Sequence, residues 1–320
     1  MDLRQAAGVV AYSLAVTEIA AADPAVSVTM CVNNMVAEVL QAFGTDEQRQ
    51  RWIPPLVGGT FTSGSFCLSE AGAGSDPQGM RTRAVRGDGG WILDGTKAWI
   101  TSGAHAGVFI VWARTDDRIS TFVVDPRTDG ISFGKPEEKT GQHASNTVTL
   151  GFDDVHLPDD ALLGDVGRGF PVAMMALDGG RVGIASQSLG IGRAVLTELR
   201  SFGVEDAALA DIEAEWTAAR LLVLRAASMK ERAEPFSREA SMAKLYASEQ
   251  CGRACDAAFR LLGAHAFRQP SFLDKLARDA RVTRMTDVTG VDFVDTSGVA
   301  AVTRTRTGSE VAPATSALPT

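Results

Sequence analysis

The hydrophobic pattern of this chain changes its period twice, and that order constrains the fold more than any other feature. Residues 1–60 carry apolar side chains at three- and four-residue spacing, which is typical of helices. Residues 61–165 contain short β-branched and aromatic runs separated by Gly-rich turns, and residues 166–302 return to helical spacing. Strands grouped between two sets of helices predict an α+β multidomain protein rather than alternating βαβ units.

The same pattern divides the chain into domains. We expect a short N-terminal helical domain over 1–60 and a small antiparallel barrel or sandwich over 61–165. A helical bundle is expected over 166–302. The last stretch, 303–320, is small, polar and Pro-containing, which predicts a disordered tail.

Local signals place some element ends. Thr45 and Gln48 have the spacing of a capping box and predict the start of a short helix. That helix is expected to stop at Pro54-Pro55. Turns are expected at 88–90 and again at Asp94-Gly95, with strands on either side.

Bulk composition narrows the class of partner. The net charge of −8 argues against nucleic acid, which binds Lys- and Arg-rich surfaces. No apolar stretch approaches the ~20 residues expected of a membrane helix. The N-terminal residues show no secretory signal, so a cytoplasmic location is expected, with no membrane and no nucleic acid as partners.

The four cysteines do not suggest a metal centre. Cys251 and Cys255 lie one helical turn apart, as in half of a metal site. No His or Cys pair with suitable spacing completes it. We therefore expect buried thiols in a reducing compartment and no bound metal.

Four segments spread along the chain carry a family resemblance. They are FCLSEAGAGSD (66–76), GTKAWITSGAHA (95–106), LDGGRVGIASQSLGIGRA (177–194) and EASMAKLYASE (239–249). Together they resemble the FAD-dependent acyl-CoA dehydrogenases, and the resemblance runs from near residue 8 to about residue 290. The family's fold is an N-terminal helical domain, a central antiparallel β-barrel and a C-terminal helical bundle, so the resemblance implies a barrel for 61–165.

The resemblance also implies a flavin site. The residues implied to contact the isoalloxazine ring are Phe66, Cys67, Leu68, Ser69, Trp99, Ile100 and Thr101. Ser75 is implied to face the acyl-CoA, and the Thr101 hydroxyl to lie near the reactive ring nitrogen. Hydrogen-bond donors aimed at the ring favour its reduced state, because that state carries extra negative charge.

The third segment is implied to hold the CoA portion of the thioester. Asp178 and Arg181 occupy the matching positions. An Asp and an Arg three residues apart on a helix also form local ion pairs, which contribute little at a surface. Both interpretations are open at the level of sequence.

The family's catalytic base is a Glu, and here the matching segment places Asp287 at that position. Val288 stands where the family has Gly. Asp is a competent base, because its reference pKa is close to that of Glu. Its side chain is shorter by one methylene, about 1.5 Å of reach, and a misplacement of about 1 Å can cost ~100-fold in rate. A solvated Asp at the exit of a helix is the alternative.

The residues expected at the FAD diphosphate differ from the family pattern. An Arg-x-Gln-Phe-Gly segment that reaches a neighbouring subunit's FAD is missing after RAVLTELRSFG. In RLLGA, Gly263 is kept, Arg260 replaces Gln and Ala264 replaces a second Gly. Arg260 has the charge to meet a phosphate, whereas Ala264 and His265 are expected to crowd the backbone.

The resemblance implies FAD-dependent α,β-desaturation of an acyl thioester carried by CoA or by acyl carrier protein. Its implied partners are an electron-transfer flavoprotein and further subunits in a homo- or hetero-oligomer. Two alternatives are open. One is a non-catalytic or cofactor-sharing subunit of a hetero-oligomeric acyl-CoA dehydrogenase. The other is a redox-neutral relative that binds thioesters without flavin turnover.

Overall fold

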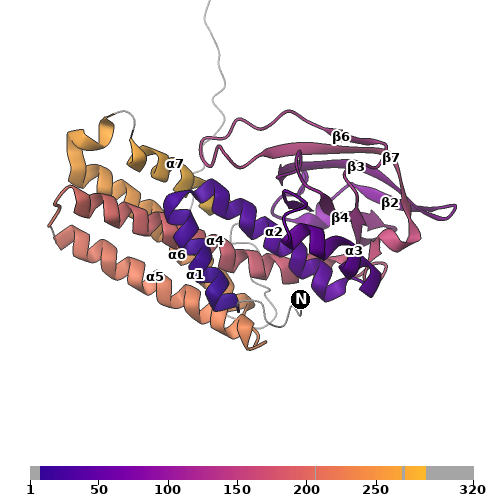
Figure 1. The fold of residues 1–320 in the computed structure, drawn as a ribbon, viewed down its shortest axis with the longest axis horizontal. Helices are drawn as coiled ribbons and strands as arrows, with labels where there is room; N and C mark the ends of the chain where they lie inside the picture. Colours follow the sequence, from indigo (N-terminus) through magenta and orange to yellow (C-terminus); the bar gives the residue numbers. More distant parts are fainter. Residues whose placement is uncertain (1–7, 206, 269–270, 286–320) are drawn as a thin grey trace, which may run out of the picture.

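The structure, a computed structural model, describes residues 8–205, 207–268 and 271–285. The predicted order of helices, strands and helices is confirmed. Figure 1 shows the β-sheet at one end of the molecule and the long helices of the bundle at the other. The α4 helix runs from the sheet into the bundle, so one element connects both parts.

Three helices form the described part of the N-terminal region, residues 8–60. Asp23 caps the second helix through its carboxylate, and Pro24 occupies the first turn, where a missing N–H costs nothing. The predicted capping box of the third helix is present, with Thr45 N donating to Gln48 Oε1 and Gln48 N to Thr45 Oγ1. The helices are α1 (Val9–Ala22), α2 (Pro24–Phe43) and α3 (Asp46–Val57).

The expected stop at Pro54-Pro55 is wrong, because α3 continues to Val57. A proline has no backbone N–H, so it cannot donate the helical hydrogen bond at its position. Pro54 and Pro55 lie near the end of α3, so the helix loses only these two bonds. Ile53 and Leu56, on either side, are buried in a core cluster. Burial of this apolar face holds the last turn in helical form.

The expectation that no apolar stretch approaches membrane-spanning length is corrected by α2. Within the described residues, this 20-residue helix is long and apolar enough, by length and composition alone, to cross a membrane. A core helix of a globular protein can have the same length and apolar composition. Val28, Val36 and Leu40 of α2 are buried inside the protein, so α2 contributes to the core.

The sheet is open and mixed, which corrects the predicted antiparallel barrel. Among the described residues it has eight strands: seven follow the order β6-β7-β3-β2-β4-β5-β8, and β1 pairs with β4 beside this path. Both β1 and β2 run parallel to β4, and the other pairs are antiparallel. The strands are β1 (Gly64–Cys67), β2 (Arg83–Gly87), β3 (Gly90–Thr101), β4 (Val108–Thr115), β5 (Arg118–Val124), β6 (Ile131–Phe133), β7 (Thr147–Pro158) and β8 (Leu162–Leu163).

Of the two turns expected in this region, one is confirmed. The β2–β3 hairpin turns at Asp88-Gly89. The second turn is wrong, because β3 passes straight through Asp94-Gly95 with a register shift against β7. Gly95 has φ 143°, and a Cβ there would lie 2.6 Å from the Thr82 Cα. A glycine that resembles a turn signal therefore marks a bulge with a close backbone approach.

The C-terminal part consists of long helices. Pro235 separates two of them, as expected. The helices are α4 (Gly169–Ser201), α5 (Ala207–Glu231), α6 (Ser237–Leu262) and α7 (Phe272–Met285), with the short η4 (Gly263–Phe267) between α6 and α7. The tail predicted over 303–320 lies outside the described residues.

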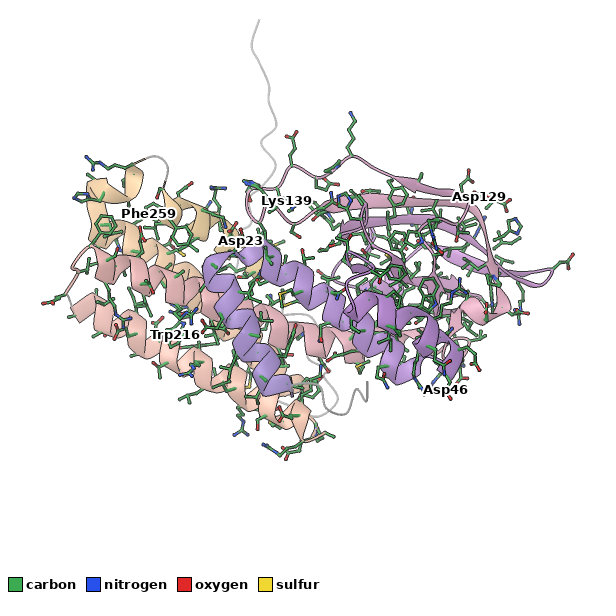
Figure 2. All side chains as sticks on the ribbon, viewed as in Figure 1. Asp23, Asp46, Asp129, Lys139, Trp216 and Phe259 are labelled. Carbon is green, nitrogen blue, oxygen red and sulfur yellow. The ribbon has the colours of Figure 1, made fainter. Side chains whose placement is uncertain are left out.

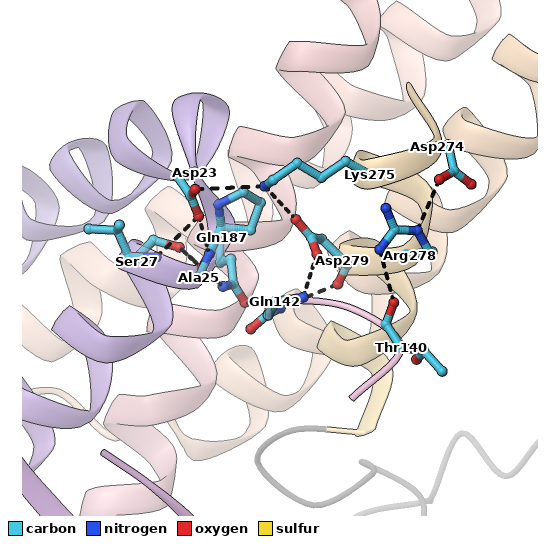
Figure 3. Close-up of polar contacts among 12 residues, drawn as sticks. Asp23, Ala25, Ser27, Thr140, Gln142, Gln187, Asp274, Lys275, Arg278 and Asp279 are labelled. Atoms are coloured by element: carbon cyan, nitrogen blue, oxygen red, sulfur yellow. Dashed lines mark hydrogen bonds and ion pairs between the residues drawn. The ribbon is translucent and has the colours of Figure 1, made fainter. Parts of the chain in front are cut away.

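A buried polar cluster joins three helices to the sheet domain, as Figure 3 shows. Gln142, in the loop between β6 and β7, donates from its backbone N to Asp279 Oδ1 of α7 at 2.5 Å and from Nε2 to the Asp279 carbonyl at 3.3 Å. Gln187 of α4 donates to the carbonyl of Pro24 at 2.6 Å and lies 3.5 Å from Gln142 Nε2. The cluster therefore fixes where α2, α4 and α7 meet the loop.

The loop also packs against α7 through its backbone. A Cβ on Gly141 would lie 2.4 Å from the Arg278 carbonyl oxygen, so only glycine fits there. Gln142 itself has a left-handed backbone, with φ 51°. A buried non-glycine residue in this conformation persists only where its surroundings hold it, here through both bonds to Asp279.

Candidate active site

The structure brings together two sequence segments that lie about 30 residues apart. The Ala98 N–H donates to the Ser69 carbonyl at 2.9 Å, and Ser65 Oγ donates to the Thr101 carbonyl at 2.7 Å. The two segments, 65–69 and 98–101, therefore form one surface at the end of β1 and β3. This is the pairing that the predicted flavin site requires.

Trp99 is the most unusual residue on this surface. The residue is 62% exposed, and its backbone is left-handed, with φ 61°. The β3–β7 register shifts between Lys97 and Ile100, so a bulge turns Trp99 outward. An aromatic residue at positive φ is strained and persists only where neighbouring contacts hold it. Such an arrangement is typical of a side chain that covers a bound group.

Other predicted ring contacts point into the core. Cys67 and Ile100 are buried in the same apolar cluster, and burial raises the pKa of the Cys67 thiol well above its usual range. Leu68 is buried in a second cluster. Phe66 packs against Trp112 with ring centroids 4.2 Å apart. Cys67 and Ile100 can therefore present only their backbone to a ligand, whereas Ser69 and Thr101 are half-buried.

The loop that follows β1 ends in an exposed tip. Gly72, Gly74 and Ser75 are exposed, and a Cβ on either glycine would meet no atom within 4 Å. The Asp76 carboxylate accepts from Gln78 N at 3.0 Å and starts the η2 turn (Pro77–Gly79). Ser75 thus lies on the solvent side of the loop, available to a substrate.

Asp178 and Arg181 form the local ion pair that their spacing allows, but the pair is buried rather than at the surface. Arg181 Nη1 donates to Asp178 Oδ1 at 2.6 Å, and the two side chains are 7% and 16% exposed. Ser237 Oγ at the start of α6 also donates to Asp178. The Arg181 Nε is buried without a partner among the described residues. A buried guanidinium with a spare donor fits the polar part of a ligand, which agrees with the CoA interpretation.

The residues expected at the diphosphate are not brought to this surface. Arg260 is in the last turn of α6, directly after Phe259, which Figure 2 labels at the end of the bundle away from the sheet. Gly263 has φ 51° and open space around its Cβ position, and Ala264 and His265 are exposed. Among the described residues, no atom lies within 4 Å of the Gly263 Cβ position, and Arg260 is exposed.

Sequence reasoning missed a buried ion pair beneath the surface. Lys97 Nζ lies 2.8 Å from Glu70 Oε1, with side chains 0% and 10% exposed. Burial lowers the pKa of Lys97, and Glu70 counters this effect. Burial raises the pKa of Glu70, but Lys97 and the hydrogen bonds to the carboxylate lower it by more, so its pKa is below the usual value. Glu70 and Lys97, each flanked by apolar or small residues within its motif, were the available signal.

Elsewhere the described residues contain hollows but no candidate metal site. No group of three or more His, Cys, Asp or Glu residues there could hold a metal ion. One hollow of about 280 Å³ lies between α5 and α6 beside Met242, and another of about 390 Å³ lies at the β2–β3 turn. The first is lined in part by Glu239 and Met242 of the segment EASMAKLYASE, and the second contains no motif residue. The candidate base, Asp287, lies outside the described residues.

Comparison with known proteins agrees with this geometry. Three family models match: "Acyl-CoA dehydrogenase, N-terminal domain" over residues 5–60, "middle domain" over 65–155 and "C-terminal domain" over 167–300. The short-chain specific acyl-CoA dehydrogenase of Bos taurus mitochondria is 42% identical over 295 residues, covering 86% of this chain and 71% of that protein.

Two solved structures support the same relationship. The butyryl-CoA dehydrogenase of Megasphaera elsdenii is 35% identical with a TM-score of 0.86, covering 90% of this chain and 80% of that one. A glutaryl-CoA dehydrogenase of Mycobacterium smegmatis in complex with FADH2 is 29% identical with a TM-score of 0.84, covering 89% and 77%. The chain therefore belongs to the acyl-CoA dehydrogenase family.

Proposed function

We propose that this protein is an FAD-dependent enzyme that introduces an α,β double bond into a short-chain acyl-CoA. The observation that carries the proposal is the convergence of segments 65–69 and 98–101 at the exposed, strained Trp99. The relatives' names, short-chain acyl-CoA dehydrogenase and butyryl-CoA dehydrogenase, indicate the substrate class.

FAD is the cofactor that the family implies, and the residues at this surface fit its ring. The Trp99 indole offers a flat face in solvent. The Thr101 hydroxyl forms no hydrogen bond with other described residues, so it is free to donate. The remaining contacts come from Phe66, Ser69 and the backbone of Cys67, Leu68 and Ile100. When bound, FAD supplies the acceptor for the hydride that leaves the β carbon of the thioester.

The other roles belong to the chain's own residues. Asp287 takes the proton from the α carbon, a role that rests on its sequence position alone. Arg181, held by Asp178, binds the polar part of CoA, and Ser75 contacts the thioester from the loop tip. An electron-transfer flavoprotein is the expected partner for reoxidation.

The direct test uses FAD-loaded protein without oxygen. Butyryl-CoA is expected to bleach the flavin absorbance in one turnover and to give crotonyl-CoA in equal amount. Palmitoyl-CoA serves as the long-chain comparison and is expected to react more slowly. If butyryl-CoA binds but neither bleaching nor enoyl product follows, the proposed function is wrong.

Thr101→Ala is expected to make the flavin harder to reduce. Removing a donor to a charged ring costs about 1.5 kcal/mol or more, which for a two-electron couple corresponds to about 30 mV. The reduction potential of the Ala variant should therefore fall by at least about this amount, with the absorbance spectrum shifted. Thr101→Ser keeps the hydroxyl and is the control. An unchanged potential in Thr101→Ala would remove this residue from the site.

A cofactor-sharing subunit is the second candidate function. It is favoured by the position of Arg260 and Gly263 at the bundle end, away from the ring surface. If these residues contact FAD, they contact the FAD of another chain.

FAD content is therefore expected to depend on assembly. The chain purified alone as a monomer should hold less than one FAD per copy, and occupancy should rise in oligomers or on co-expression with related subunits. The flavin-to-protein ratio across size-exclusion fractions measures this. A monomer fraction with full occupancy would contradict the proposal.

A further inference from the structure

Lys97 is a fully buried ammonium beneath the ring surface, and its surroundings define what it does. Its Nζ donates to the Leu68 carbonyl at 3.0 Å and to Glu70 Oε1 at 2.8 Å, and it lies 3.9 Å from Met80 Sδ. An ammonium without water is costly unless its donors are used. Its position therefore depends on the segment that starts at Leu68.

Glu70 extends the connection to the other end of the loop. Its Oε2 accepts from Arg81 N at 2.7 Å, and its Oε1 accepts from Thr82 N at 3.0 Å. One carboxylate thus joins the two ends of the loop, residues 70 and 81–82. Through Lys97 it also attaches both ends to β3.

The Glu70–Lys97 pair lies between the ring surface and the exposed tip of the loop. On one side, Ser69 and Ala98 form the backbone bond of the ring surface. On the other, the exposed tip carries Ser75, and the glycines at 72 and 74 have open space around them. Ala73, between these glycines, is buried in the core and exchanges two backbone hydrogen bonds with Glu70, so the exposed tip is attached to the same end of the loop that Glu70 holds. The geometry of the ends therefore sets the position of the tip relative to the ring surface.

We propose that Glu70 and Lys97 are a positioning pair that fixes the thioester-contacting loop tip relative to the flavin-contacting backbone. The inference rests on the proposed function, since that function assigns Ser75 and Ser69 their ligands. Both side chains are buried beneath the surface, 0% and 10% exposed, so their role is to position other groups. The competing interpretation is an ion pair that only stabilises the fold.

The pair of variants Lys97→Met and Glu70→Gln/Lys97→Met separates the two interpretations. Lys97→Met leaves a carboxylate without its counter-charge, whereas the double variant replaces both charges by neutral groups of similar size. Removing the unpaired charge should restore part of the stability that Lys97→Met loses. The double variant does not restore the bond from Lys97 to the Leu68 carbonyl or the joint attachment of both loop ends.

In FAD-loaded protein, Lys97→Met is expected to slow flavin reduction at saturating butyryl-CoA by about 10- to 100-fold, the cost of a misplacement near 1 Å. The double variant is expected to recover part of the lost melting temperature, because the unpaired charge is gone, but not this rate. Val16→Ala, which removes buried methyl groups from α1, is the control for lost stability alone. Its rate should equal that of the wild type.

Two results would overturn the positioning role. One is a double variant that reduces flavin within about twofold of the wild type, because only stability would then have been lost. The other is a Lys97→Met rate equal to that of Val16→Ala.

Amide hydrogen exchange gives a measurement without substrate. Lys97→Met should raise the exchange rate over residues 68–82 and leave that of β4 and β5 unchanged. No rise over 68–82 would contradict the proposal. A wild-type protein that butyryl-CoA does not reduce would instead refute the proposed function, and the exchange data would then decide the role of the pair.

Discussion

Asp287→Asn is expected to slow the reduction of bound flavin by butyryl-CoA by about 10²- to 10⁴-fold, the usual contribution of a general base. The amide cannot accept the α proton at neutral pH. FAD content and thioester binding should be retained, because only the proton-transfer step is removed. Anaerobic stopped-flow absorbance measures the rate, and a thioester titration of the oxidised flavin measures binding.

Asp287→Glu is the matched variant for this prediction. The longer side chain restores the reach of the family's Glu, so its activity should equal or exceed that of the wild type. Val288 adds bulk beside this position, and if it has moved the backbone, the Glu variant should be slower than the wild type. If Asp287→Asn reduces flavin at the wild-type rate, Asp287 is not the base. The base would then be an acid elsewhere in this chain or one supplied by a partner chain. The cofactor-sharing interpretation would then be favoured over the proposed enzyme function.

Asp279→Ala is expected to lower the free energy of unfolding by about 2–4 kcal/mol, because it leaves the buried Gln142 N–H without an acceptor and removes a hydrogen bond to a charged group. Asp279 is 2% exposed, so water cannot replace the lost contact. For a chain of this size the first thermal transition should fall by several degrees. Differential scanning calorimetry measures the change.

Asp279→Asn is the control, because its amide oxygen can still accept from Gln142. It loses the charge that pairs with Lys275 at 2.9 Å. The Lys275 side chain is 37% exposed, so this loss should be about 1 kcal/mol or less. Equal destabilisation by Ala and Asn would show that the ion pair, rather than the bond across the domain junction, holds α7.

Much of the fold was predictable because its signals are local. The capping box of Thr45 and Gln48 and the hairpin at 88–90 depend on residues within a few positions, and both are present. The order of helical and strand zones follows from side-chain periodicity, which the sequence shows directly. The paired motifs around Ser69 and Trp99 were also predicted to meet, through the family resemblance.

The errors arose where distant contacts outweigh local preference. Pro54-Pro55 does not end α3, because Ile53 and Leu56 are buried in the core. Gly95 does not turn the chain, because β7 and Thr82 hold β3 on both sides. The barrel does not close, because closure depends on which edge strands pair, and no single strand encodes that.

For this protein, the sequence alone determined the helix, sheet and helix order, the family resemblance and the residues to test, because periodicity and motif spacing are properties of neighbouring residues. Only the tertiary structure decided that Asp178 and Arg181 are buried, that Glu70 and Lys97 connect the loop to β3, and that Arg260 lies away from the ring surface. Burial and charge pairing between residues far apart in the chain depend on the completed packing, which local sequence does not specify.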